Sequence, residues 1–224
     1  VRAGAIVLGD SVPFLPVGVH LAVVDPDVGA QRRAVAMGLG DGRMLVGPDN
    51  GLLMLAAQAG DGVVEAVDIA RSPFRRQPVS ATFHGRDIFA PVAAALAGGA
   101  SLAEVGDPLD AEGLVALRLP EPRWRDGVLI AHVRSADRFG NLQLNVRHED
   151  LAGSGLKLGH GAALEFPHGA VVTVVYVRTF ADVGRDELLL YEDAQRRLAI
   201  AVSHGDASDR LGLGVDDELR IAPG

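Results

Sequence analysis

The stretch AVAMGLGDGRMLVGPDNGLLMLAAQAGDGVVEAVDIA, from Ala34 to Ala70, decides the fold of the first half of the chain. Residues 34–40 and 42–47 are short apolar runs joined by a glycine-rich turn, which predicts a hairpin of two strands. Residues 50–59 follow with a helical pattern, and residues 63–70 form another apolar run. Continuous apolar strands between helices imply a sheet covered on both faces. The stretch therefore predicts an α/β fold.

The same alternation extends to both sides of this stretch. VHLAVVD, residues 19–25, predicts a strand, and GRDIFAPVAAALAGG, residues 85–99, predicts a helix that ends on glycines. We therefore expect an α/β domain over residues 1–107, with its sheet covered by helices. Prolines and glycines break the pattern over residues 108–126, which predicts a linker.

Beyond residue 126 the apolar spacing changes to two, which is typical of β-strands. No long helical pattern is present. Strand candidates separated by Gly, Asp and His turns cover residues 128–137, 141–146, 162–167, 170–180, 187–192 and 197–203. Residues 127–224 therefore predict a small all-β, barrel-like domain.

Charge and composition limit the class of partner. The net charge of −8 argues against nucleic acid or an anionic membrane, because both bind clustered Lys and Arg. The chain has no cysteine for disulfides or thiolate sites, and its seven histidines show no metal-ligand spacing. No apolar run approaches the roughly 20 residues that span a bilayer. We therefore expect a cytoplasmic protein with no metal and no cofactor.

The first polar cluster is VVDPDVGAQRR, from Val23 to Arg33. Pro fixes φ and Gly permits a positive φ, so the segment predicts a turn. An ordinary acidic turn explains it. A ligand site also explains it, because the turn follows a strand that we expect to be buried, and open α/β sheets bind ligands at the carboxyl ends of their strands.

The second cluster places His84, Arg86 and Asp87 directly before a helical run. Asp87 can stabilise the amino end of that helix, and Arg86 can pair nearby. His84 fits a hydrogen-bonded core residue as well as a catalytic one.

The third cluster is SADRFGNLQLNV, from Ser135 to Val146. It predicts a hairpin turn between two strands. Asp137 and Asn141 would also offer an acceptor and an amide for polar recognition, so a structural turn and a ligand site both remain open.

Together these clusters resemble the S-adenosyl-L-methionine hydroxide adenosyltransferases, also called S-adenosylmethionine hydrolases, which are relatives of the fluorinases and chlorinases. Five segments occur in the family's order with its spacing. They are HLAVVDPDVGAQRR (20–33), LVGPDNGLL (45–53), VSATFHGRDIFAPVAA (79–94), DRFGNLQLN (137–145) and RLAIAVSHGDAS (197–208). The resemblance implies hydrolysis of S-adenosyl-L-methionine to adenosine and L-methionine by attack of water or hydroxide on ribose C5′.

The resemblance also implies the catalytic residues Asp25, Arg32 and His84. The halogenases have tyrosines at the positions of Asp25 and His84, and the fluorinases have a halide-contacting serine at the position of Gly85. By these residues the chain is similar to the branch that uses water.

Substrate-binding residues follow from the same resemblance. It implies Asp137 for the methionine amine, Asn141 for the edge of adenine and Phe180 for stacking on adenine. Phe139 belongs to the same binding motif as Asp137. Backbone around Ser203 and His204 would complete the adenine pocket. The family further implies a homotrimer, with each site between the α/β domain of one subunit and the barrel of the next.

The chain departs from the family pattern in two places. Family members begin with a strand that carries Thr-Asp-Phe-Gly and an acidic residue for the ribose hydroxyls, and this chain begins after that segment. Near Ala194 and Gln195 it lacks the small hydroxyl or basic residues that bind the methionine carboxylate in relatives. Three alternatives stay open: a non-catalytic module that binds S-adenosylmethionine or adenosine, a chlorinase-like halogenase, and a chain that folds poorly because a core strand is missing.

Overall fold

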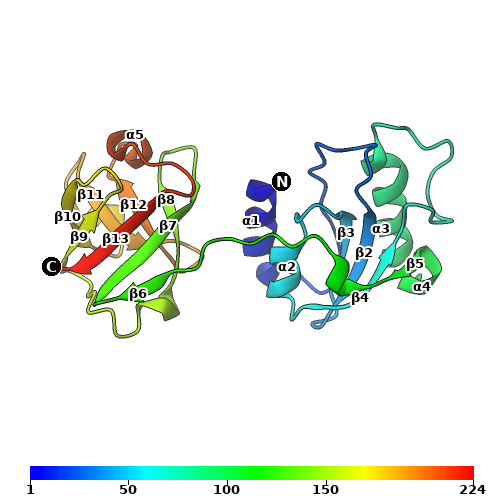
Figure 1. The fold of residues 1–224 in the computed structure, drawn as a ribbon, viewed down its shortest axis with the longest axis horizontal. Helices are drawn as coiled ribbons and strands as arrows, with labels where there is room; N and C mark the ends of the chain where they lie inside the picture. Colours follow the sequence, from blue (N-terminus) through cyan, green and yellow to red (C-terminus); the bar gives the residue numbers. More distant parts are fainter. The chain divides into compact units, whose positions relative to one another are not determined.

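The computed structural model describes all of residues 1–224, and the chain forms two compact units, Val1–Arg118 and Leu119–Gly224 (Figure 1). Each unit has its own sheet. The class is mixed α/β, with a five-stranded sheet in the first unit and a closed seven-stranded barrel in the second.

The first unit is built on a mixed sheet with strand order β1-β3-β2-β4-β5. Only β1 and β3 pair in parallel, and the other pairs are antiparallel. The strands are β1 (Val19–Leu21), β2 (Ala34–Leu39), β3 (Met44–Pro48), β4 (Val63–Asp68) and β5 (Asp107–Leu109). The helical segments are α1 (Arg2–Ser11), η1 (Val12–Phe14), α2 (Met54–Ala59), η2 (Gly85–Phe89), α3 (Ala90–Ala97), α4 (Leu102–Val105) and η3 (Ala111–Gly113).

The central strand β2 is buried along its whole length because both of its faces are covered. Its alternate side chains point to opposite faces of the sheet. Val35 and Met37 join one apolar cluster with residues of α1 and α2, and Ala34 and Ala36 join another with residues of α3 and α4. This explains why the sequence shows a continuous apolar run there.

Three details differ from the expectation for this half. The helices are few and short, so a sheet covered by helices is not confirmed. The strand expected over residues 19–25 ends at Leu21, lies at the sheet edge and is only partly buried. Residues 108–126, expected to be a linker, contain most of β5 and all of η3 and β6 (Arg123–Arg125). β5 pairs with β4, so the sheet continues past the expected end of the domain.

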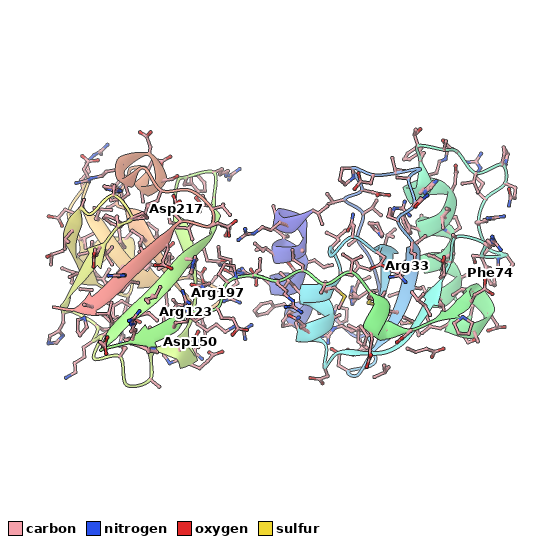
Figure 2. The ribbon with its side chains drawn as sticks, viewed as in Figure 1. Arg33, Phe74, Arg123, Asp150, Arg197 and Asp217 are labelled. Carbon is pink, nitrogen blue, oxygen red and sulfur yellow. The ribbon has the colours of Figure 1, made fainter.

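A buried carboxylate fastens the segment after η3 to the sheet. Asp49, which follows β3, accepts a hydrogen bond from Arg33 Nε at 2.7 Å and from the backbone N–H of Val115 at 2.8 Å. Arg33, labelled in Figure 2, also donates to the carbonyl of Gly113. The Asp49 side chain is only 3% exposed, so these bonds replace water that it has lost.

We expect Asp49→Ala to lower the stability of the first unit by about 2–3 kcal/mol, because it leaves Arg33 and the Val115 N–H without their buried acceptor. Amide hydrogen exchange in β2 and β3 measures this. The single Trp and both Tyr lie in the second unit, so fluorescence does not report on the first. Asp41→Ala is the control, since Asp41 pairs with Arg43 at a hairpin tip. Equal protection in the two variants would contradict the prediction.

The second unit is a barrel in which β13 pairs with β7 and closes the ring β13-β9-β10-β11-β12-β8-β7. β6 extends β7 outside the ring, and β10 and β11 are the one parallel pair. The strands are β7 (Val128–Ala136), β8 (Leu142–Arg147), β9 (Gly161–Glu165), β10 (Val171–Tyr176), β11 (Leu188–Glu192), β12 (Arg197–Val202) and β13 (Glu218–Pro223). Short helical segments are η4 (His148–Leu151), η5 (Phe180–Asp182) and α5 (Ala207–Leu211).

The barrel-like class expected for this half is confirmed, and its six expected strands are present. The sequence analysis missed β6, β13 and the short helix α5. Aliphatic side chains from all seven strands of the ring fill its interior as one cluster, including Leu129, Leu164 and Ile221. None of the helices is long and apolar enough to cross a membrane.

Candidate active site

Asp25 and Arg32 form a buried ion pair in the loop between β1 and β2. Arg32 Nε donates to both carboxylate oxygens of Asp25 at 2.9 Å, and its Nη2 pairs with Oδ2. The Arg32 side chain is 9% exposed and the Asp25 side chain 5%. A carboxylate that binds one side of a planar guanidinium fixes its orientation, so the remaining N–H groups of Arg32 have defined directions.

His84 joins this pair from a segment distant in sequence. Arg32 Nη2 lies 2.9 Å from His84 Nδ1. A guanidinium can only donate, so Nδ1 must accept, and the neutral ring then carries its proton on Nε2. His84 therefore presents an N–H donor at Nε2. We call these three residues the Asp25–Arg32–His84 cluster.

The turn of π-helix η2 holds Arg32 from two sides. His84 immediately precedes this turn, and Phe89 is its last residue. The guanidinium carbon of Arg32 lies 5.1 Å from the centre of the buried Phe89 ring. This is a cation–π contact, so η2 and the residue directly before it supply both the aromatic ring and the imidazole that contact Arg32. The helix predicted over residues 85–99 is present as η2 followed by α3, which begins at Ala90.

The environment of His84 favours the neutral imidazole. Burial and then the positive charge of Arg32 lower the pKa of His84 below its usual value, while Asp25 and Asp87 act in the opposite direction. Protonation would place a hydrogen on Nδ1, directly against the guanidinium of Arg32. His84 is therefore neutral at pH 7.

The two loops of the cluster touch at a glycine. Gly29, in the loop between Asp25 and Arg32, has φ +85°, a left-handed conformation that favours glycine. A Cβ at this position would lie 2.6 Å from the carbonyl oxygen of Ala81, three residues before His84. The close approach of the two backbones needs a residue without a side chain.

A second group of expected site residues comes together on the barrel. Two adjoining depressions, of about 420 and 510 Å³, share Phe180 and His204. They are lined by Phe139, Asn141, Thr179, Phe180, Ala181, Val202, Ser203, His204 and Gly205. All six expected substrate-binding residues therefore lie here or, for Asp137, in hydrogen-bond contact with Asn141.

The turn between β7 and β8 is organised around Asp137. Its Oδ1 accepts from the backbone N–H groups of Phe139 and Asn141, at 2.8 and 3.0 Å, and its Oδ2 accepts from the Asn141 side-chain amide at 2.8 Å. Gly140 has φ +79°, and a Cβ there would collide with the carboxylate of Asp206. The turn is therefore rigid, and the amide oxygen of Asn141 remains an acceptor.

The sequence analysis missed Tyr191, which packs against Phe180 with ring centres 5.0 Å apart and planes tilted by 56°. Burial, with Asp193 and Asp137, raises the pKa of Tyr191 to about 12, so the phenol keeps its proton. Its aromatic ring supports one side of Phe180. Nothing in the local pattern of β11 distinguishes Tyr191 from a core residue.

Comparisons with known proteins agree across the whole chain. The family model described as the SAM hydroxide adenosyltransferase N-terminal domain matches residues 1–106, and that of the C-terminal domain matches residues 131–220. The chain belongs to the SAM hydroxide adenosyltransferase family. The resemblance stated from the five sequence motifs is thus confirmed.

Individual members and relatives of the family show the same pattern. An (R)-S-adenosyl-L-methionine hydrolase from Salinispora tropica is 46% identical over all of this chain and 82% of its own length. One from Thermus thermophilus is 35% identical over 98% of this chain and 82% of its own. A fluorinase from Actinoplanes is 31% identical over 70% of this chain and 53% of its own.

The fold is also found in a crystal structure of an uncharacterized conserved protein from Thermotoga maritima. It superposes with a TM-score of 0.91 and 33% identity, over 99% of this chain and 83% of that one. That protein therefore has the folds of both units of this chain.

Proposed function

We propose that the chain hydrolyses (R)-S-adenosyl-L-methionine to adenosine and L-methionine by attack of water or hydroxide on ribose C5′. The observation that carries the proposal is the Asp25–Arg32–His84 cluster, in which a carboxylate, a guanidinium and an imidazole from distant segments bond to one another. Relatives named as hydrolases of this substrate cover the whole chain and support it.

The chemistry of the substrate explains why these residue types suffice. The sulfonium leaves as a neutral thioether, so its departure requires no general acid. The C5′–S bond breaks with its electron pair going to sulfur, a C5′–O bond forms, and one proton of water is released to solvent. The difficulty is the weak nucleophile, which must be held in line with the breaking bond.

The cluster meets this need with hydrogen-bond donors. The second N–H of Arg32 Nη1, which has no partner after the bonds of Arg32 to Asp25, His84 and the Arg33 carbonyl, and the Nε2–H of His84 would both donate to the attacking oxygen, which favours its hydroxide-like form. Asp25 fixes the guanidinium by accepting two of its N–H groups. In this proposal His84 orients the nucleophile through Nε2 and Asp25 acts through Arg32.

The barrel residues supply recognition. We assign stacking on adenine to Phe180, with Phe139 as a second apolar wall of the same depression. The amide oxygen of Asn141 accepts from the exocyclic amine of adenine, and backbone at Ser203 and His204 completes the pocket. Asp137 Oδ2 accepts only one hydrogen bond and keeps a further lone pair, which suits the methionine ammonium.

We extend the proposal to the domains and to assembly. The first unit, with residues 1–107, is the catalytic domain, and the second unit, with residues 127–224, binds the substrate. Residues 108–126 join them and add most of β5 and all of η3 to the first unit and β6 to the second. The active protein is a homotrimer, as the resemblance implies. Sedimentation equilibrium tests the trimer, and a monomeric active enzyme would contradict it.

The decisive experiment incubates the protein with (R)-S-adenosyl-L-methionine in ¹⁸O-labelled water. We expect equal amounts of adenosine and methionine, with the label in the 5′-hydroxyl of adenosine. Parallel reactions contain high chloride or fluoride. A 5′-halogenated deoxyadenosine would show a halogenase instead, and calorimetric binding without either product would show a non-catalytic binding module.

The rate should depend on the neutral form of His84. We expect kcat/KM to be constant near neutral pH and to fall about tenfold per pH unit below the pKa of His84, which burial and Arg32 place below the usual histidine value in the free protein. A pH–rate profile with substrate well below KM measures this. An acidic limb at or above the usual histidine value, or a rate that rises as pH falls, would contradict the role assigned to His84.

A further inference from the structure

Asp87 is a buried carboxylate that the proposed mechanism does not use. It lies in η2, three residues after His84, and is completely shielded from solvent. The sequence analysis offered it as a residue that stabilises the amino end of a helix, but it makes no capping bond there. Its partners are instead the backbone N–H of Ser80, which precedes His84, and the neighbouring side chain of Arg86.

The carboxylate closes the segment from Ser80 to Asp87 into a loop. Asp87 Oδ2 accepts from the backbone N–H of Ser80 at 2.8 Å, and Arg86 pairs with both oxygens at 2.7 and 2.9 Å. Backbone bonds add to this, from Asp87 N–H to the Phe83 carbonyl at 3.2 Å and from Arg76 N–H to the Asp87 carbonyl at 2.8 Å. His84 lies inside the closed loop.

Arg86 completes the closure on the outer side. Its guanidinium carbon lies 4.7 Å from the centre of the Phe83 ring, so the residue before His84 is held as well. The bonds from Arg86 and from the Ser80 N–H lower the pKa of Asp87 to about 2, so the carboxylate is charged at neutral pH. The loop is thus closed at its ends by the bond between the ionised Asp87 and Ser80, and it is held beside His84 by the contact between Arg86 and Phe83.

The same loop also contacts the segment that carries Asp25 and Arg32. The carbonyl of Ala81, next to Ser80, is the group that approaches Gly29 closely. Gly29 lies between Asp25 and Arg32. A shift of the Ser80–Phe83 backbone would therefore move His84 relative to Arg32.

We propose that Asp87 is a positioning residue, which sets the Arg32–His84 geometry by fixing the Ser80–Phe83 backbone against Gly29. The inference rests on the proposed hydrolysis at the Asp25–Arg32–His84 cluster. Asp87 touches neither substrate nor the reacting atoms in this role. A purely structural carboxylate would stabilise the unit without affecting the catalytic step.

The test compares Asp87→Asn with Asp68→Asn. Asp68 is the matched control. It is a partly buried carboxylate of the first unit, and like Asp87 it accepts a hydrogen bond from a backbone N–H, that of Ala70, at 2.8 Å. We expect Asp87→Asn to lower kcat about tenfold with KM changed less than about twofold, since small misplacement of a catalytic group is costly. Asp68→Asn should leave both constants within about twofold of the native protein.

A spectroscopic readout separates this inference from the proposed function. The ¹⁵N chemical shifts of the His84 ring report its tautomer and its titration, whether or not the protein hydrolyses S-adenosylmethionine. Arg32, Asp25 and Asp87 are the charged groups that act on His84. We expect Asp87→Asn to lower the pKa of His84 further and to weaken the Nδ1 hydrogen bond, and Asp68→Asn to change neither.

Arg86→Gln serves if Asp87→Asn does not fold. Arg86 is 47% exposed, so its replacement threatens folding less. We expect a smaller fall in kcat in the same direction, about threefold. The inference is overturned if the folded Asp87 variant matches Asp68→Asn in kcat and in the His84 ring shifts, or if only Arg86→Gln folds and it matches the native protein in both.

Discussion

Replacement of Arg32 by leucine should lower kcat for S-adenosyl-L-methionine hydrolysis by about 10²–10³-fold, because removal of one preorganised donor to a developing oxyanion has effects of this size in other enzymes. The change removes the group that bonds to both Asp25 and His84. It also leaves the Asp25 carboxylate, which is only 5% exposed, without its cation. Adenosine formation under saturating substrate measures the loss.

Two companion variants sharpen this prediction. Arg32→Lys keeps the positive charge but cannot bind Asp25 through two N–H groups and His84 through a third, so we expect only partial recovery of kcat. Arg43→Leu is the control, since Arg43 also pairs with a carboxylate of the first unit, Asp41, but at a hairpin tip. If Arg32→Leu and Arg43→Leu have the same kcat, Arg32 is not a catalytic residue.

The second large effect should come from Phe180, which we assign to stacking on adenine. Base–aromatic stacking contributes about 1–3 kcal/mol per base, so Phe180→Ala should raise KM by about tenfold to a hundredfold, with a smaller change in kcat. Calorimetric titration with adenosine measures the corresponding loss of binding affinity without turnover. The loss includes the support that Tyr191 gives to the ring.

Phe74→Ala is the control for this variant. Phe74, labelled in Figure 2, is 42% exposed and Phe180 is 38% exposed, so the two changes remove similar amounts of apolar surface. Phe74 lies in the first unit, outside both groups of site residues. A KM that is unchanged by Phe180→Ala, or raised equally by both variants, would contradict the adenine assignment.

The sequence predicted those parts of the fold that depend on local patterns. Period-two spacing predicted the six strands β7 to β12, and the continuous apolar run predicted β2. The sequence-based prediction failed for strands whose position depends on pairing with distant strands. β13 closes the barrel through β7 and β9, yet ELRIAP is short and follows an acidic turn, so its local pattern is weak. β5, with a proline in its centre, is likewise defined by β4.

The candidate site was predictable from motifs but not from geometry. The five matched segments named Asp25, Arg32 and His84, and no spacing rule alone could have brought them together across two loops. The role of Asp87 could not be read from sequence, because an acidic residue beside a helix start has a common local explanation. The partner that ties Asp87 to the preceding segment, the Ser80 amide, is a backbone group and leaves no signature in the residue pattern.

The contact between Gly29 and Ala81 bears on how such enzymes are engineered. Mutant libraries usually vary side chains that bear functional groups. Neither Gly29 nor Ala81 has such a side chain. A methyl group at Gly29 would still push apart two backbones that carry all of the proposed catalytic apparatus. Substitution of Gly29 would change the distances among Asp25, Arg32 and His84 and leave their chemical groups the same. A library restricted to reactive residues would never include this position.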